Sequence, residues 1–207
     1  IQTGVTAVAI NARGFNSSFN NRMLMLEDGR VAVLPENGLP VGQFTAIPKV
    51  DLDGVEVLVG PGASLYGQDA SNGVISLQTK DPKEHPGTIV EMAGGTRDYL
   101  DLQFRQAGVF GDGHWGYKIA GEWQEADDFS NRLNYGTAET PLPEVDANWH
   151  TSVARAEGSV VYYDEEMNNL RVEATGGWSE SDAIGQTNVG RNQIEDWSYS
   201  FQQLRAS

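Results

Sequence analysis

The chain has 207 residues, with 24 Gly, no Cys and 29 acidic against 14 basic side chains, for a formal net charge of -15. Such acidity argues against a nucleic-acid partner, because phosphate binding needs clustered Lys and Arg and only four Lys are present. Without Cys there is no disulfide framework, thiolate metal site or Cys nucleophile. No apolar run approaches the roughly 20 residues of a membrane-spanning helix, whereas a membrane-spanning strand needs only about ten residues of alternating polarity.

The two ends of the chain indicate part of a longer protein. It begins at Ile1 without an initiator Met and stops at Ser207 inside an alternating pattern. We therefore expect an internal piece, so the absence of a targeting signal carries little weight.

Before residue 86, short apolar runs are separated by turn signals. Asp28-Gly29 lies between the runs 23–26 and 31–34 and predicts a hairpin. Further strands are predicted over 55–59 and 73–79, and a short helical turn fits residues 39–49 only weakly. These elements predict a small mixed α+β domain.

After Pro86 the polarity alternates with period two, which is typical of strands with one apolar and one polar face. Lys118, Arg155 and Arg171 all lie on the polar parity. The pattern predicts about six strands, over 88–93, 100–105, 115–123, 154–162, 170–178 and 197–201.

The predicted connections differ in length between the two ends of these strands. Segments 111–114 and 164–168 are short, whereas 125–151 and 179–195 are long and rich in Asn, Asp, Ser and Gly. Short turns at one end and long loops at the other are typical of an outer-membrane barrel. The Gly94-Gly95 connection is the short exception on the outer side.

Aromatic residues weigh between such a barrel and a soluble antiparallel sandwich, which also alternates. Trp115 and Trp123 share one parity and would lie roughly 20 Å apart along the membrane normal, close to the ~25 Å apolar band between aromatic girdles. Trp178 and Trp197 lie at the ends of other strands. The pattern favours the membrane barrel, with its basic residues facing the lumen. Six strands cannot close that barrel, so more chain or other chains must complete the wall.

Possible catalytic or ligand motifs fail on their decisive residues. The loop Gly60 to Gly67 has Leu65 where a Rossmann fingerprint needs Gly, and Gln68-Asp69 where a P-loop needs Lys and Ser or Thr. The three His are isolated beside turns, and the acids Asp51, Asp53, Glu125, Asp127 and Asp128 are expected to be solvated. We therefore expect no enzyme activity, no metal site and no cofactor.

A family resemblance is carried by motifs that are weak singly and specific in their order. They are Arg13-Gly14-Phe15, Asn21-Arg22, Met25-Leu26-Glu27-Asp28-Gly29-Arg30, Ile47-Pro48, Val55-Glu56-Val57-Leu58, Gly60-Pro61-Gly62-Ala63-Ser64-Leu65-Tyr66-Gly67, Asn72-Gly73-Val74-Ile75 and Thr79-Lys80-Asp81-Pro82. Residues 1–83 resemble the plug domain of TonB-dependent outer-membrane receptors, lacking its N-terminal part, and 84–207 resemble the first barrel strands around it. The family commonly has Arg where this chain has Gly54 and Val59, so plug docking is expected to differ.

The resemblance implies a partial membrane β-barrel of antiparallel strands with a small mixed α+β plug domain inside it, in the bacterial outer membrane. It implies TonB-dependent active uptake of a scarce large substrate, with a ferric siderophore first and cobalamin, haem or a glycan as alternatives. The implied partners are that substrate, outer-membrane lipid and TonB, which would grip a segment before Ile1.

The same resemblance suggests roles for individual residues. Substrate contacts are expected at outward plug apices and in the long outer loops; at the apices they are Asn16, Ser17, Ser18, Phe19, Asn20, Glu36 and Asn37. Structural roles in the plug are expected for Arg13, Gly14, Glu56, Gly60, Gly62, Gly67 and Gly73. Arg13 and Glu56 are candidates for an ion pair, and the glycines serve tight turns or close packing.

Two other functions stay open from the residues. A receptor-like barrel could serve as a structural or binding subunit of an outer-membrane assembly, and a soluble enzyme on a β scaffold is the third. A TonB-binding segment upstream would favour transport over the structural role.

Overall fold

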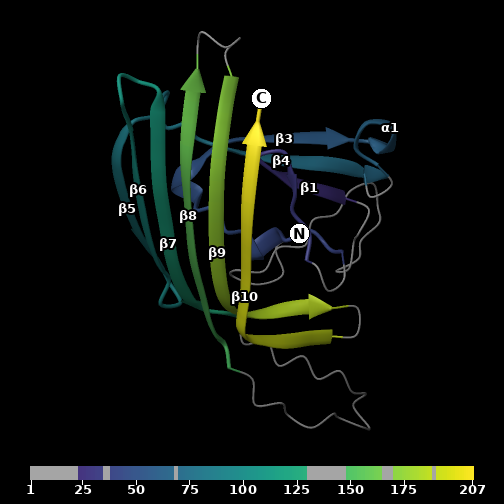
Figure 1. The fold of residues 1–207 in the computed structure, drawn as a ribbon. Helices are drawn as coiled ribbons and strands as arrows, with labels where there is room; N and C mark the ends of the chain where they lie inside the picture. Colours follow the sequence, from purple (N-terminus) through teal and green to yellow (C-terminus); the bar gives the residue numbers. More distant parts are fainter. Residues whose placement is uncertain (1–22, 35–37, 68–69, 130–147, 165–169, 188–189) are drawn as a thin grey trace, which may run out of the picture.

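The computed structural model describes residues 23–34, 38–67, 70–129, 148–164, 170–187 and 190–207. These residues form two sheets and a few helical turns (Figure 1). The elements are β1 (Met23–Glu27), β2 (Arg30–Val31), the 3-10 turns η1 (Gly42–Phe44) and η2 (Lys49–Asp51), β3 (Leu52–Val59), α1 (Ala63–Tyr66), β4 (Gly73–Thr79), β5 (Gly87–Gly94), β6 (Leu100–Phe110), β7 (Trp115–Asp127), β8 (His150–Asp164), β9 (Leu170–Thr187) and β10 (Gly190–Ala206).

The first sheet has four strands in the order β2-β1-β4-β3. The predicted hairpin is confirmed: β1 and β2 pair antiparallel across Asp28 (φ 46°) and Gly29 (φ 81°), the left-handed pair that a two-residue turn requires. β1 pairs parallel with β4, and β3 pairs antiparallel with β4. The predicted strands at 55–59 and 73–79 are thus present in a mixed sheet.

The loop from Gly60 to Gly67 contains one short helix, α1, before β4 begins. The sequence predicted a second strand after this loop but no helical turn within it. Among the described residues, no helix is long and apolar enough to cross a membrane.

The second sheet has six antiparallel strands in chain order, β10-β9-β8-β7-β6-β5. All six predicted strands are present, and most are longer than predicted because pairing continues into their flanks. Figure 1 shows them curving around one side of the four-stranded sheet. The described strip is open, since β5 and β10 are its edges.

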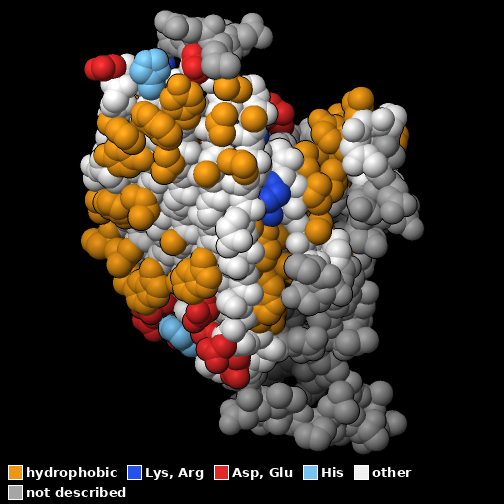
Figure 2. All heavy atoms as spheres, in the orientation of Figure 1, with side chains coloured by type: hydrophobic (Ala, Val, Ile, Leu, Met, Phe, Trp, Pro, Cys, Tyr) orange, Lys and Arg blue, Asp and Glu red, His pale blue; other side chains and the backbone are white. Residues whose placement is uncertain are grey.

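Alternation along the six strands separates two faces. On β7, buried residues alternate with exposed ones, and Trp115 and Trp123 are 41% and 39% exposed on the outer parity. Trp178 on β9 is likewise exposed. Figure 2 shows hydrophobic side chains spread over this outer face, with acidic ones toward both ends. The predicted division into an apolar outer and a polar inner face is confirmed for β7.

Two expectations about β9 and β10 are wrong. Segment 179–195 is not a loop, because β9 continues to Thr187 and β10 starts at Gly190. Each strand satisfies the other's backbone groups, which outweighs the loop-like composition. Trp197 does not join an outer girdle, since its ring packs 4.2 Å from Phe44 of η1 on the inner side.

Gly73 is the glycine with the tightest surroundings in the four-stranded sheet. It has φ 157°, and a Cβ there would lie 2.4 Å from the Leu58 carbonyl oxygen. We expect Gly73→Ala to destabilise the four-stranded sheet by about 1–3 kcal/mol, since β3 would have to shift. Urea titration of the full protein, read by proteolysis within residues 1–83, measures this. Gly54→Ala is the control, because a Cβ at position 54 would lie 3.8 Å from its nearest neighbour, the side-chain oxygen of Gln78. Equal midpoints for both variants would contradict the expectation.

Candidate functional site

Buried polar side chains join the concave face of the six-stranded sheet to the four-stranded sheet. At the centre lies Asp51 of η2, which is fully buried. Arg105 Nε donates to Asp51 Oδ1 at 2.5 Å, and Lys118 Nζ donates to Oδ2 at 2.6 Å. Each cation also reaches a second acceptor: Arg105 Nη1 donates to the His85 carbonyl at 2.7 Å and Lys118 to Thr79 Oγ1 at 2.6 Å. Through Arg105 and Lys118, Asp51 therefore connects η2 to Thr79 at the end of β4 and to His85 shortly before β5.

This arrangement corrects the expectation for Asp51, which the sequence assigned to solvent. Asp53, two residues on, is 49% exposed as expected, and His85 approaches it at 3.5 Å. The cations of the central contact lie on β6 and β7, whereas the family arginines absent at Gly54 and Val59 would lie on β3. In the described residues an acid of η2 is thus held by bases on the strands around it, and the expected difference in docking from the family stays a prediction.

A second polar contact fixes Asp81, which follows β4. Tyr163 of β8 donates its hydroxyl to Asp81 Oδ1 at 2.9 Å, and Arg171 of β9 donates to Oδ2 at 3.1 Å. Together with Lys118 and with Arg155, which donates to the Gln43 carbonyl at 3.2 Å, Arg171 confirms the predicted inward orientation of the basic residues.

A third contact uses β10. Arg30 Nη1 donates to the Tyr199 hydroxyl at 2.6 Å, and its guanidinium lies 3.8 Å from the centroid of the Phe201 ring. Tyr199 belongs to an apolar cluster with Met25, Ala32, Leu34 and Val41 of the domain that contains the four-stranded sheet, here called the inner domain. The inner parity of β10 is therefore aromatic because it completes the core of the other sheet.

Arg30 also pairs with the buried Glu27. Burial raises the pKa of Glu27, and the hydrogen bond from Thr45 and the charge of Arg30 oppose that rise. Thr45 Oγ1 donates to Glu27 Oε1 at 2.5 Å. Arg30 thus joins Tyr199 of β10 to the buried Glu27, and the positive charge of Arg30 stabilises the ionised form of that carboxyl group.

A fourth contact lies nearer the start of β6 and the end of β7. Lys49 Nζ is 3.1 Å from Asp101 Oδ2 and 3.4 Å from Glu122 Oε1. The backbone N–H groups of Lys49 and Val50 donate to Glu122 Oε2 at 2.9 Å and to Gln103 Oε1 at 2.8 Å. Lys49 is the member of this group with the most accessible side chain, at 52% exposed.

The predicted site residues are placed only in part. Arg13, Gly14, Asn16 to Asn20, Glu36 and Asn37 lie outside the described residues, so the predicted substrate contacts stay predictions. Glu56 is exposed on β3, the edge of the described sheet, and its pairing with Arg13 also stays a prediction. Gly60 and Gly67 have φ values of 135° and 92°, and a Cβ on Gly62 would lie 3.2 Å from Leu58.

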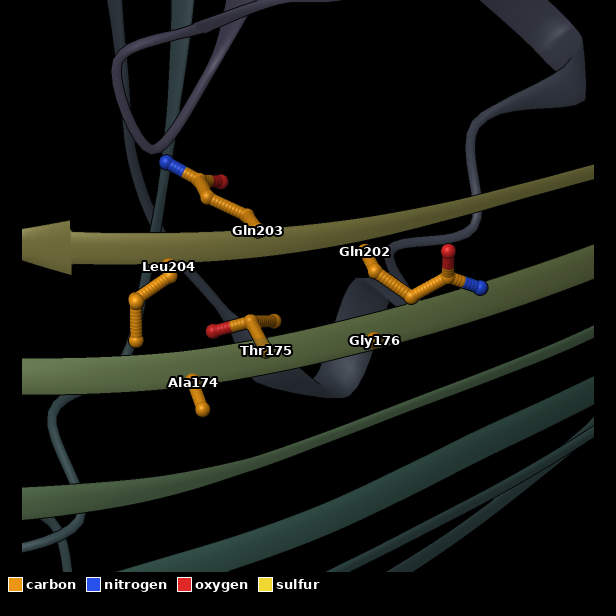
Figure 3. A pocket seen from close by; sticks show the side chains of 6 residues that line it. All are labelled: Ala174, Thr175, Gly176, Gln202, Gln203 and Leu204. Atoms are coloured by element: carbon orange, nitrogen blue, oxygen red, sulfur yellow. The ribbon is translucent and has the colours of Figure 1, made fainter.

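Other acids and grooves add little to this picture. Asp128 is buried, which contradicts the expectation that it is solvated. No group of three or more His, Asp or Glu in the described part of the chain could hold a metal ion. A shallow groove of about 460 Å³ lies between β9 and β10, lined by Ala174, Thr175, Gly176, Gln202, Gln203 and Leu204 (Figure 3). β8 separates this groove from β6 and β7, which carry the partners of Asp51 and Lys49. The polar interface holds the buried charged groups and is the candidate site.

The central contact generates a stability prediction. We expect Asp51→Ala to destabilise the docked inner domain by about 3–5 kcal/mol, because Arg105 and Lys118 would stay buried without their anion. Thermal release of the inner domain, followed by protease cleavage of the full protein, measures the loss. Asp53→Ala is the matched control and should shift the midpoint little, since its pair with His85 is exposed. The same midpoint for both variants would refute the role of Asp51.

Residues 2–74 match the family described as TonB-dependent Receptor Plug Domain. The chain is 33% identical over 135 residues to the vitamin B12 transporter BtuB of Vibrio vulnificus. The matched stretch covers 63% of this chain and 21% of that protein. It is 35% identical over 63 residues to the pesticin receptor of Yersinia enterocolitica, covering 30% of this chain and 9% of the receptor. The chain thus spans about a fifth of the length of the BtuB relatives it matches.

Solved structures share the fold. The copper transporter OprC aligns over 88% of this chain and 26% of its own, with TM-score 0.59 and 17% identity. A ferric enterobactin receptor (PfeA) mutant from Pseudomonas aeruginosa aligns over 90% of this chain and 31% of its own, with TM-score 0.59 and 19% identity. The plug match, the BtuB relatives and this shared barrel fold agree with the two docked sheets described above, and residues 2–74 belong to the plug-domain family of TonB-dependent receptors.

Proposed function

We propose that the receptor containing this chain takes up a scarce, large substrate across the bacterial outer membrane with energy supplied through TonB. Its candidate substrates are vitamin B12 and ferric siderophores. The observation that carries this proposal is the plug sheet fixed against the inner face of the barrel strands by the Asp51, Asp81, Arg30 and Lys49 contacts. A plug held in this way would block passive passage through the completed barrel, so passage would require an energy-driven rearrangement.

The names of the relatives support the two substrate classes. BtuB proteins of Vibrio and Photobacterium are vitamin B12 transporters, and PfeA is a ferric enterobactin receptor. The sequence placed siderophores first, whereas the matched relatives add weight to vitamin B12. These relatives are transporters and receptors, which agrees with a function other than catalysis.

The connections between the strands support an orientation. Residues 111–114 link β6 to β7, while the link from β7 to β8 runs from residue 128 to residue 149. Long loops of outer-membrane barrels face the outside, and short turns face the periplasm. Substrate would therefore arrive at the end where β7 stops, and Asn16 to Asn20, Glu36 and Asn37 remain proposed contacts there.

The character of the plug contacts supports a rearrangement without global unfolding. Charged and polar groups dominate the contact of η2 with β6 and β7, and water can replace each partner once the plug moves. TonB is proposed to deliver the work through a segment N-terminal to the plug. That work would break the contacts of η2 with β6 and β7.

Uptake assays in the native bacterium test this function. We expect deletion of the receptor gene to abolish high-affinity uptake of either radiolabelled vitamin B12 or an iron-55 siderophore complex. Deletion of TonB should also abolish uptake, while binding of the same substrate to cells persists, because binding precedes the energised step. Uptake of both substrates at the parental rate in the receptor deletion would refute the proposal.

A further inference from the structure

Lys49 is a cation that the plug presents at the outer end of the interface. It begins η2, and its carboxylate partners lie near the start of β6 and the end of β7. The ammonium-bearing side chain is 52% exposed, while those of Asp101 and Glu122 are 5% and 0% exposed. A molecule arriving from the outer end can therefore reach Lys49 but not the two acids behind it.

The direction of the Lys49 ammonium is fixed by its surroundings. Asp101 Oδ2 accepts hydrogen bonds from Lys49 Nζ, the Tyr99 hydroxyl and Gln103 Nε2, each at 3.1 Å. Tyr99 in turn accepts from Gln124 Nε2 at 3.0 Å. The carboxylate that holds Lys49 thus accepts from two further donors, so the ammonium is positioned before any ligand binds.

Lys49 keeps capacity for a further acceptor. An ammonium has three N–H donors, and among the described residues Nζ makes one hydrogen bond, to Asp101, and one longer ion-pair contact, to Glu122. Burial lowers the pKa of Lys49, but Glu122 and Asp101 raise it by more, so the pKa is raised overall. The group stays charged and can donate to an oxygen atom without losing its present partners.

The charges around Lys49 cancel. Asp101 and Glu122 are balanced by Lys49 and by Arg155, whose Nη1 lies 3.8 Å from Glu122 Oε2. A balanced site offers a directed donor without a strong positive field. It therefore suits a ligand of low net charge with oxygen acceptors better than a polyanionic chelate.

We propose that Lys49 is a substrate contact, donating from its ammonium to an oxygen acceptor of a transported substrate of low net charge. This inference rests on the proposed uptake function and names the substrate class for it. Asp51, two residues along, is held by Arg105 and Lys118, so η2 stays docked while the remaining Lys49 N–H donates to the ligand.

Binding to the full receptor provides the first test. The probes are cyanocobalamin, which is neutral, and ferric enterobactin, which is a polyanion. We expect the wild type to bind cyanocobalamin more tightly, and Lys49→Met to weaken that binding by roughly 10-fold or more, as for loss of a hydrogen bond from a charged donor. Lys49→Arg should recover part of the affinity. Lys83→Met, at an exposed site over the Tyr163 ring at the other end of β8, is the matched control and should bind like the wild type.

Amine labelling of intact cells provides the second test and does not depend on the affinity. A membrane-impermeant amine reagent should modify Lys49 and leave Lys118 unmodified, because the Lys118 side chain is only 2% exposed. Cyanocobalamin should protect Lys49.

The outcomes separate the two proposals. Equal affinity of the wild type and the Lys49→Met variant for cyanocobalamin, or a receptor that leaves Lys49 unlabelled, overturns the inference and leaves uptake standing. Tight binding of ferric enterobactin alone overturns the low-charge class. Failure of both probes to bind, and to protect a labelled Lys49, overturns the substrate classes proposed for uptake together with this inference.

Discussion

The buried carboxylate of Asp51 is the constraint on which the rest of this structure depends. A charge removed from water must be compensated, and Arg105 and Lys118 compensate it from two neighbouring barrel strands. Those strands must therefore pair in one register, and η2 must lie against them. The position of η2 then places Lys49 against Asp101 and Glu122 and leads directly into β3. One ion-pair network thus couples the location of the plug to the alignment of the barrel wall.

Apolar packing against β10 also holds the plug to the barrel strands. Around β6 and β7 the interface is polar, whereas at β10 it is aromatic, with Phe44 against Trp197 and Arg30 over Phe201. The polar part is specific in geometry and tolerant of water, while the apolar part resists separation. The two parts give the plug one side that can hydrate and another that cannot do so without loss of its core.

Much of the fold follows from local pattern in the sequence. Alternation along 115–123 predicts β7, and Asp28-Gly29 predicts the first hairpin, because both signals are carried by neighbouring residues. Alternation along 197–201 predicts an outward-facing aromatic parity. This is wrong for Trp197, because that parity packs against the apolar cluster of the plug. Asp51 gave no signal, since its partners lie 54 and 67 residues away. The candidate site was missed for the same reason, because it joins η2 to strands distant in sequence.

The aromatic face of β10 bears on how the plug can move. Tyr199 belongs to one apolar cluster with Met25, Leu34 and Val41. Withdrawal of the plug as a rigid body would expose this cluster to water, at a cost that grows with the apolar area uncovered. A smaller rearrangement that leaves β1 seated on β10 and opens the polar flank beside β6 and β7 avoids that cost. In the proposed uptake, the two flanks would divide the plug into a half that stays in place and a half that moves, and a permeation path would run along the moving half.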